Sequence, residues 1–272
     1  MLPVIPARSL RGGAGTIPRP AFVGRQTRGM SDVSPPATPG SSVSRRYATS
    51  QASDPARATS VVYGTDVPSE SDLRLLGPVE GKRLLDLGCG IGHNAVVLAR
   101  QGAKVLGVDP DAALLAQARQ RAEAAEVKVE LHQSALADLP FLRSDSVDAA
   151  LSVMALATAE DLARVFRQVH RVLKPEAQLV ASFPHPVSGL FEPGGAEPAK
   201  AVHPYQRSEP VTWQEGPRTV VDHPRTIAEI FTTLHRSSFV VDQVLEPVPS
   251  GIPTGWPVVP TTLIIRARKQ GN

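Results

Sequence analysis

Hydrophobic positions follow two alternating patterns from about residue 68 to the C-terminus. Mainly apolar runs, typical of buried strands, occur at 82–88, 103–109, 147–153 and 177–183, and an alternating run at 127–132 also predicts a strand. Between these runs, apolar residues recur at the spacing of a helix face. This spacing and the flanking cap residues predict helices over 69–77, 93–102, 160–174 and 226–237, one more that begins at Pro110, and two final strands over 239–247 and 261–269.

Strands that alternate with helices need right-handed crossovers, which produce a parallel sheet with helices on both faces. We therefore predict an α/β fold with a doubly wound, mostly parallel sheet. No helix is expected between the last two strands, so they are predicted to pair antiparallel at the edge of the sheet.

The segment 184–222 interrupts this rhythm. It is rich in Pro and Gly but also carries Phe191, Tyr205 and Trp213, with Phe183 just before it. A long insertion in a compact domain is typical of a lid or binding loop. The aromatic residues are expected either to line a ligand pocket or to form a small core under the loop.

Residues 1–55 are rich in Pro, Gly, Ser, Ala and Arg, with no acidic residue before Asp32. Such a segment buries too little apolar surface to order itself, so we predict a disordered basic tail and a domain that spans 56–272. An Arg-rich, acid-free start is compatible with a mitochondrial presequence, and hence a matrix location. The alternative, which we favour because Pro and Gly disrupt helices, is that translation begins at Met30 or later and that the protein is cytoplasmic.

The formal charge of +3 is unevenly distributed. Residues 1–60 carry eight Lys or Arg and two acidic residues, so the remaining chain is acidic by about three charges. A basic tail alone does not predict nucleic-acid binding. Cys89 is the single cysteine, which excludes an internal disulfide and a multi-cysteine zinc site, and we expect no metal. No apolar run reaches about 18 residues, so we predict a soluble protein without a membrane span.

The stretch "LLDLGCGIGHNAVVLARQGAKVLGVDPD" places a glycine-rich turn between the first strand and its helix. Such turns bind adenosine-bearing cofactors at the carboxyl edge of a sheet. A dinucleotide site needs a small third residue where this chain has His93, and Asp86 would repel a pyrophosphate but suits a cationic group. Asp109, at the end of the second strand, is placed to accept hydrogen bonds from ribose hydroxyls.

This stretch, followed by "LADLPFLRSDSVDAALSV" and "VFRQVHRVLKPEAQLVASFPHP", resembles the successive motifs of class I S-adenosylmethionine-dependent methyltransferases. The subgroup it looks most like includes enzymes of quinone biosynthesis and of small-molecule methylation. The resemblance implies a seven-stranded sheet of order 3-2-1-4-5-7-6 with an antiparallel last strand.

The resemblance also implies S-adenosyl-L-methionine as the cofactor. When the motif is carried over position by position, the resemblance implies that Gly88, Gly90 and Gly92 lie against the cofactor. It also implies that Asp86 lies near the ammonium group of the cofactor and that Asp109 binds its ribose. At Ala135 many relatives carry an Asp that binds the adenine amino group, so that contact is expected from backbone or from Asp138. The full set of implied cofactor-binding residues is Tyr63, Asp86, Gly88, Cys89, Gly90, Gly92, Asn94, Asp109, Pro110, Ala135, Leu136 and Ser152.

Two histidines are candidate catalytic bases, since both are predicted at the cofactor edge of the sheet: His185 after the fifth strand and His223 before the last helix. The alternative for each is a structural role, as a loop residue that bonds to the backbone. The motifs that mark methylation of nucleic-acid bases, protein arginine or metal-bound catechols are absent, so the partner we expect is a small organic acceptor with an O, N or C nucleophile. The alternatives are a protein that binds the cofactor without turnover and, less favoured, a nicotinamide-dependent oxidoreductase. The acceptor itself and the oligomeric state stay open.

Overall fold

The structure is a computed structural model that describes residues 59–65, 67–192, 200–248 and 259–271, together with Val43 and Tyr47. Most of the predicted tail over 1–55 therefore lies outside the described residues. Val43 is buried in the domain core, and Tyr47 packs against the same cluster. The boundary at residue 56 stays a prediction, but these two side chains belong to the packing of the domain.

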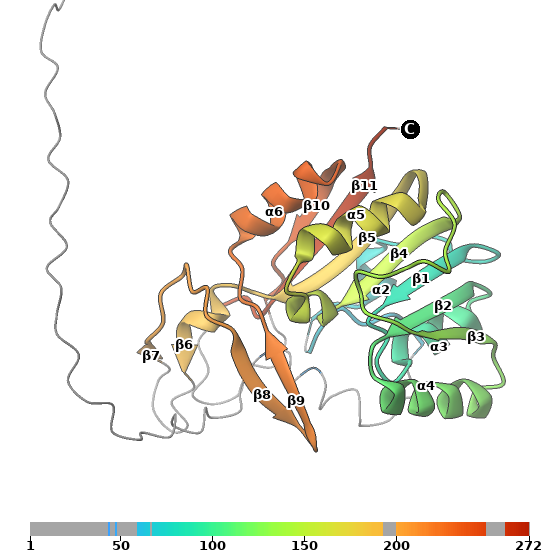
Figure 1. The fold of residues 1–272 in the computed structure, drawn as a ribbon, viewed down its shortest axis with the longest axis horizontal. Coiled ribbons are helices and arrows are strands. Elements are labelled where there is room, and N and C mark those ends of the chain that lie inside the picture. The colour runs from blue at the N-terminus through green and yellow to red at the C-terminus, as the bar shows by residue number, and fades with distance from the viewer. Residues whose placement is uncertain are drawn as a thin grey trace, which may run out of the picture. The chain divides into compact units, whose positions relative to one another are not determined.

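A seven-stranded sheet forms the centre of the described domain (Figure 1). Its order is β10-β11-β5-β4-β1-β2-β3, which is the predicted order 3-2-1-4-5-7-6 when these strands alone are numbered along the chain. Strand β11 is antiparallel to both β5 and β10, whereas the other pairs are parallel. The strands are β1 Arg83–Leu87, β2 Lys104–Asp109, β3 Val129–Gln133, β4 Val147–Val153, β5 Leu173–Pro184, β10 Phe239–Leu245 and β11 Thr262–Lys269.

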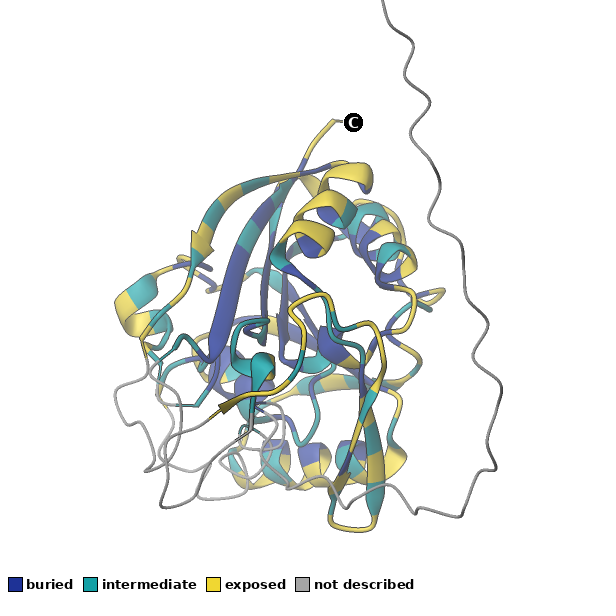
Figure 2. Ribbon diagram, turned by 90° about the vertical axis from the view of Figure 1, so that its left-hand side faces the viewer, coloured by how far each residue is buried: buried dark blue, intermediate teal, exposed yellow. Residues whose placement is uncertain are grey.

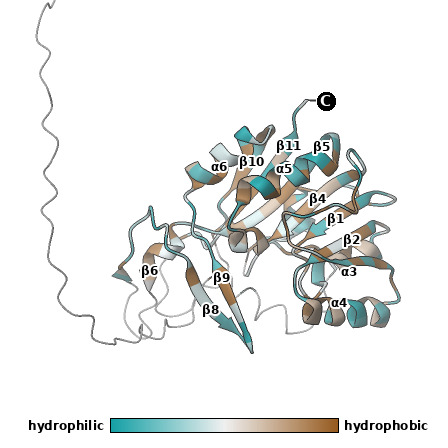
Figure 3. Cartoon of the chain, in the orientation of Figure 1, coloured by the Kyte–Doolittle hydropathy of each residue, from teal (hydrophilic) through white to brown (hydrophobic). Residues whose placement is uncertain are grey.

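Helices cover both faces of this sheet, as the alternating pattern predicts. One face packs against α5 (Leu162–Val172) and α6 (Ile227–Arg236), whose apolar stripes join the larger core cluster. The other face packs against α3 (His93–Arg100) and the segment from Val61 to Val79. Helix α4 (Ala112–Ala124) contacts β2 and β3. Among the described residues, the central strands are deeply buried and largely hydrophobic (Figures 2 and 3).

The first predicted helix is shorter than its sequence pattern indicates. The prediction of a helix over 69–77 is wrong beyond its first turn, because α2 spans only Glu70–Leu73 and Arg74 adopts a left-handed conformation. The carboxylate of Glu70 then accepts hydrogen bonds from the backbone N–H groups of residues 75, 76 and 77, at 2.8, 2.8 and 3.1 Å. A side chain therefore satisfies the donors that a continuing helix would have used.

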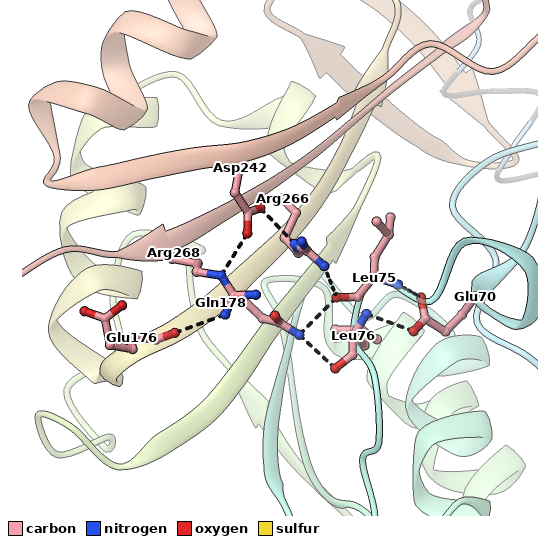
Figure 4. A network of polar contacts seen from close by, with 8 residues as sticks. All are labelled: Glu70, Leu75, Leu76, Glu176, Gln178, Asp242, Arg266 and Arg268. Atoms are coloured by element: carbon pink, nitrogen blue, oxygen red, sulfur yellow. Dashed lines mark hydrogen bonds and ion pairs between the residues drawn. The ribbon is translucent and has the colours of Figure 1, made fainter.

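The two carbonyl groups of this turn are held by the far strands of the sheet (Figure 4). Gln178 on β5 donates its side-chain amide to the carbonyls of Leu75 and Leu76, and Arg266 on β11 reaches the carbonyl of Leu75. Asp242 on β10 pairs with Arg266 at 2.8 Å. The segment before β1 is thus fastened to the opposite end of the chain.

Other helix boundaries also differ from the prediction. Helix α4 begins at Ala112 rather than at Pro110, because Asp111 is its N-cap and accepts hydrogen bonds through its side chain from the N–H groups of Ala113 and Leu114, and α3 ends at Arg100 rather than at 102. Helix α5 is also shorter. It ends at Val172 rather than at 174, and β5 begins immediately at Leu173. Leu173 pairs with Val147 of β4, so strand pairing begins before Pro175 and ends the helix earlier than that proline alone would require.

The insertion over 184–222 contains secondary structure that the sequence pattern did not predict. A 3₁₀ turn, η3 (Ser188–Leu190), leads into a two-residue strand β6 (Phe191–Glu192), which pairs with β7 (Lys200–Ala201). An antiparallel hairpin follows, formed by β8 (Val211–Glu215) and β9 (Arg218–Asp222). Part of the insertion, 193–199, lies outside the described residues.

Candidate functional site

The glycine turn between β1 and α3 forms the centre of the candidate site. Gly88, Gly90 and Gly92 all have positive φ angles, of 75°, 52° and 77°, which only glycine adopts without strain. A Cβ on Gly88 would lie 2.1 Å from the Cβ of Ala155, and one on Gly92 would lie 2.8 Å from the Cβ of Ala118. Gly88 and Gly92 are therefore fixed by packing, whereas a Cβ on Gly90 would meet open space.

Two buried carboxylates flank this turn. Asp86 on β1 accepts a backbone hydrogen bond from Ala95, but its Oδ2 atom has no partner. Burial and the neighbouring charge of Asp109 raise the pKa of Asp86 from 3.8 to about 7. Asp109 accepts hydrogen bonds from the N–H groups of Gly90 and Asp111, each at 2.9 Å, and its burial raises its pKa.

A cavity opens over the carboxyl ends of β1, β2 and β4, where a ligand site is expected in a doubly wound sheet. Most of the residues predicted to bind the cofactor line it. These are Asp86, Gly88, Cys89, Gly90, Asn94, Asp109, Pro110 and Leu136. Cys89 is 8% exposed, and burial raises the pKa of its thiol, which agrees with a small packed residue in a tight turn.

Four of the predicted cofactor residues do not line the cavity. The hydroxyl of Tyr63 donates to Glu70, in the turn shown in Figure 4, and the hydroxyl of Ser152 donates to the carbonyl of Leu87 at 2.7 Å. Gly92 is the N-cap of α3 and packs on α4. Ala135 is exposed, and the alternative contact, Asp138, pairs with Arg164 at 2.6 Å.

Asn94 has a second task besides lining the cavity. Its side-chain amide donates to the carbonyl of Val62 and accepts from the N–H of the same residue, at 3.1 and 3.0 Å. It also donates to the hydroxyl of Tyr47, another cavity residue. Burial and the charge of Asp86 raise the pKa of Tyr47. Sequence reasoning missed Tyr47 because it lies in a segment whose composition predicts disorder.

Neither predicted base lines the cavity. His185 is buried, its Nδ1 atom accepts a hydrogen bond from the N–H of Val187 at 3.1 Å, and its Nε2 atom lies 2.8 Å from a carboxylate oxygen of Glu246. Both ring nitrogens of His185 are therefore engaged in holding the start of the insertion. The backbone N–H of His223 donates to Ala157 at 2.7 Å, which ties the end of the insertion to η2 (Ala155–Thr158).

The β8–β9 hairpin supplies a wall of the cavity. Its residues alternate between the two faces, and every residue that lines the cavity lies on one of them: Trp213, Glu215, Arg218 and Val220. The other face is exposed. Of the aromatic residues predicted for a pocket, only Trp213 lines this cavity; Phe183 lies in the core, and Tyr205 is 38% exposed.

One sequence signal could have indicated this hairpin: a two-residue Gly–Pro turn that joins two segments of alternating apolar and polar residues. In the structure, Gly216 of that turn has a φ of 56°. The tip of the hairpin reaches α4 through Arg218, which pairs with Asp111 at 2.6 Å and with Glu215 at 2.7 Å. The remaining cavity residues that sequence reasoning did not place in a site are Ile91, His93, Leu114, Ala155 and Thr158. Both ring nitrogens of His93 are buried without a hydrogen-bond partner.

The fold and this site define an α/β domain that binds an adenosine-bearing cofactor with a cationic group. Its glycine turn leaves open space at Gly90, and Asp86, whose Oδ2 atom has no hydrogen-bond partner, lines the same cavity. A positive group would satisfy that oxygen, whereas a pyrophosphate would face two buried carboxylates.

Comparisons with known proteins agree with this definition. A family model described as a methyltransferase domain matches residues 85–181. The structure of an S-adenosylmethionine dependent methyltransferase from Mesorhizobium loti is 30% identical, with a TM-score of 0.55, and the match covers 72% of this chain and 95% of that one. A solved structure from Listeria monocytogenes is 26% identical over 73% of this chain and 96% of its own, with a TM-score of 0.61. The chain belongs to the class I S-adenosylmethionine-dependent methyltransferases, whose methyl donor is S-adenosylmethionine.

Curated relatives match a shorter part of the chain. A ubiquinone biosynthesis O-methyltransferase from Alkalilimnicola ehrlichii is 36% identical over 45% of this chain and 50% of its own length. A 2-phytyl-1,4-naphtoquinone methyltransferase from Nostoc is 36% identical over 40% of this chain and 49% of its own. The chain thus spans about half the length of these two relatives. In the part of the chain that the structure describes, no helix is long and apolar enough to cross a membrane.

Proposed function

We propose that this protein transfers a methyl group from S-adenosylmethionine to an O, N or C nucleophile of a small organic acceptor. The observation that carries the proposal is the carboxylate of Asp86, which is 3% exposed and lines the cavity with one oxygen atom unpartnered. Since an unpaired buried charge is costly, the site gains free energy when a cationic group arrives beside it.

We infer that Asp86 and the residues around it each bind a different part of the cofactor. Asp86 pairs with its ammonium group, and the open side of Gly90 allows the backbone to approach it closely. Asp109 is already oriented by two backbone N–H groups, so its carboxylate is positioned to receive ribose hydroxyls. Leu114 and Leu136 provide apolar surface for the adenine ring.

S-adenosylmethionine supplies an electrophilic methyl carbon when it is bound. The protein then has to orient the acceptor and exclude water, which is the task of the hairpin wall. A base is needed only for an acceptor that is protonated at working pH. Because both ring nitrogens of His185 are engaged, the acceptor we expect is one that reacts without a histidine base from this position.

The test is a calorimetric titration of the full chain with S-adenosylmethionine, S-adenosylhomocysteine and NADH. We expect binding of the two sulfur compounds only, and a loss of about 1 to 3 kcal/mol in Asp109→Asn, where an ionised hydrogen-bond acceptor is removed. Asp148→Asn is the matched control, because Asp148 pairs with Lys174 and is absent from the cavity lining. Binding of NADH alone would refute the proposal.

Turnover is tested separately, with methyl-labelled S-adenosylmethionine and a panel of phenols, thiols, amines and stabilised carbanions. Transfer of the label to one class, with no transfer in Asp86→Asn, is the expected result. Cofactor binding without transfer to any member would favour the second candidate, a protein that binds the cofactor without turnover. The absence of the two predicted bases, His185 and His223, from the cavity lining is the observation that keeps this candidate.

A further inference from the structure

The face of the β8–β9 hairpin that lines the cavity, here called its inward face, lies in the part of the cavity that the proposed cofactor residues do not line. This part is called the second half of the cavity. The end of β4 and the residues after it line this half, namely Val153, Met154, Ala155 and Thr158, together with Trp213 and Val220. Trp213 and Val220 are directly paired across β8 and β9, so their side chains lie side by side on the inward face. The base of β9 is held against η2 by the bond from His223 to Ala157.

Trp213 carries an unsatisfied hydrogen-bond donor in this half of the cavity. It is 8% exposed, and its indole Nε1 atom is buried without a hydrogen-bond partner. Buried tryptophans ordinarily find an acceptor for this N–H group, and leaving it unpaired has a cost. Since Trp213 lines the cavity, a bound molecule can supply the missing acceptor atom.

The surrounding walls indicate the chemistry of that molecule. Met154 is 4% exposed and offers a polarisable thioether, and Val153 is 6% exposed. Among the described residues of this half, none carries a cationic side chain, and the cation at the hairpin tip, Arg218, is already paired with two carboxylates. A carboxylated or phosphorylated acceptor would therefore lack a counter-charge here, whereas a neutral ring fits against the aromatic and aliphatic walls.

We propose that Trp213 is a specificity-determining residue, which recognises a neutral, flat-ringed acceptor through a hydrogen bond from its indole N–H to an oxygen atom of that acceptor. The inference rests on the proposed function, because it takes the other half of the cavity to hold the cofactor. It assigns to the hairpin the selection of the acceptor class.

The experiment uses three probes with the same ring system: 1-naphthol, naphthalene and 1-naphthoate. The full chain is labelled with ¹⁵N and saturated with S-adenosylhomocysteine, and the two tryptophan indole cross-peaks are distinguished with a Trp256→Phe variant. We expect 1-naphthol to move the Trp213 indole proton downfield, as a new hydrogen bond would. Naphthalene is expected to bind without that shift, and 1-naphthoate not to bind.

The matched variant is Trp213→Phe, which keeps an aromatic wall and removes the donor. It should bind S-adenosylhomocysteine within twofold of the parent chain, as measured by calorimetry. Its preference for 1-naphthol over naphthalene should fall by roughly 3- to 10-fold, the factor expected for one neutral hydrogen bond.

Three outcomes would count as failures, and they can be told apart. If S-adenosylhomocysteine does not bind the parent chain, the proposed function fails before the probes are added. If it binds but the Trp213 cross-peak does not respond to 1-naphthol, or if Trp213→Phe keeps the full preference for the oxygenated ring, the role of Trp213 is refuted while the cofactor site stands. Tight binding of 1-naphthoate would overturn the neutral acceptor class.

Discussion

The guanidinium group of Arg218 lies 2.6 Å from a carboxylate oxygen of Asp111, so the tip of the β8–β9 hairpin is joined to the N-terminus of α4. Asp111 is also the N-cap of that helix and accepts from the N–H groups of Ala113 and Leu114. It follows Asp109 by two residues and donates its own N–H to it. One ion pair therefore connects the wall of the cavity to the strand end where the ribose is proposed to bind.

Loss of this ion pair should loosen the hairpin. Arg218→Gln is expected to weaken S-adenosylhomocysteine binding by about 0.5 to 1 kcal/mol and to speed its dissociation, because half-exposed ion pairs contribute on this scale. Stopped-flow displacement measures the rate. Lys174→Gln removes the 2.5 Å pair with Asp148 outside the cavity and should leave the rate unchanged. Equal rates in parent and Arg218→Gln would show that the hairpin is held by its base alone.

Asp86 should make the ligand-free protein less stable as the pH rises. Its pKa of about 7 lies above the ordinary value of 3.8, so between these values the folded chain keeps a proton that the unfolded chain releases. Stability from this group is complete below about pH 4 and is lost as the pH rises to 7. Asp86→Asn stays neutral, so its stability advantage should grow by about 2 kcal/mol between pH 5.5 and pH 8 in urea unfolding.

The same substitution should have the opposite effect on ligand binding. The ionised form of Asp86 is the one that pairs with an ammonium group, so the affinity of the parent chain for S-adenosylhomocysteine should rise from pH 6 to pH 8. Calorimetry on Asp86→Asn should find weak binding at both pH values. A parent affinity that is independent of pH would mean that Asp86 is not the partner of the ammonium group.

Two glycines of the turn should fail in different ways. Gly88→Ala places a Cβ 2.1 Å from Ala155, so a stability loss of about 3 kcal/mol or more is expected from overpacking and positive φ together. Gly90→Ala meets no atom within 4 Å and should lose about 1 to 2 kcal/mol of stability from its φ angle. Its methyl group occupies the side that the cofactor approaches, so calorimetry should record a large loss of affinity. Equal stability losses would contradict this division.

His185 should behave as a structural residue. His185→Asn is expected to lower the free energy of unfolding by about 1 to 3 kcal/mol, because a buried hydrogen-bonded group loses a partner. Its affinity for S-adenosylhomocysteine should stay within about twofold of the parent value. Glu246→Gln keeps an acceptor for Nε2 and should lose less stability. Once an acceptor is known, an unchanged pH profile of turnover in His185→Asn would confirm this role, and the loss of one ionisation would reject it.

The class of the fold could be predicted because its information is local. Apolar runs such as 103–109 and helical stripes between them indicate the elements, and the connection rules indicate a doubly wound, mostly parallel sheet. The acids Asp86 and Asp109 could be placed for the same reason, since both lie at strand ends where ligands collect. The order of the strands was implied by the resemblance to the methyltransferase motifs.

The rest of the site depends on contacts between segments far apart in the chain. Nothing in the local sequence indicates that Tyr63 turns toward Glu70, or that Arg218 reaches back to Asp111. The two histidines were placed at the correct edge of the sheet by topology, but edge position does not decide which way a ring points. His185 is fixed by Glu246, 61 positions later, and that partner could not be read from the motif around it.

The network in Figure 4 also constrains when the contacts of the sheet can form during synthesis of the chain. The carbonyl of Leu75 receives a hydrogen bond from Arg266, which is 191 positions later, and from Gln178. Strand β11 lies between β5 and β10, so β10 cannot join the sheet until residue 262 and the rest of β11 have left the ribosome. Until β11 has left the ribosome, the turn around Glu70 and the edge of β5 stay without their final partners. A nascent chain at that stage exposes an unpaired strand edge, which is the kind of surface that chaperones protect.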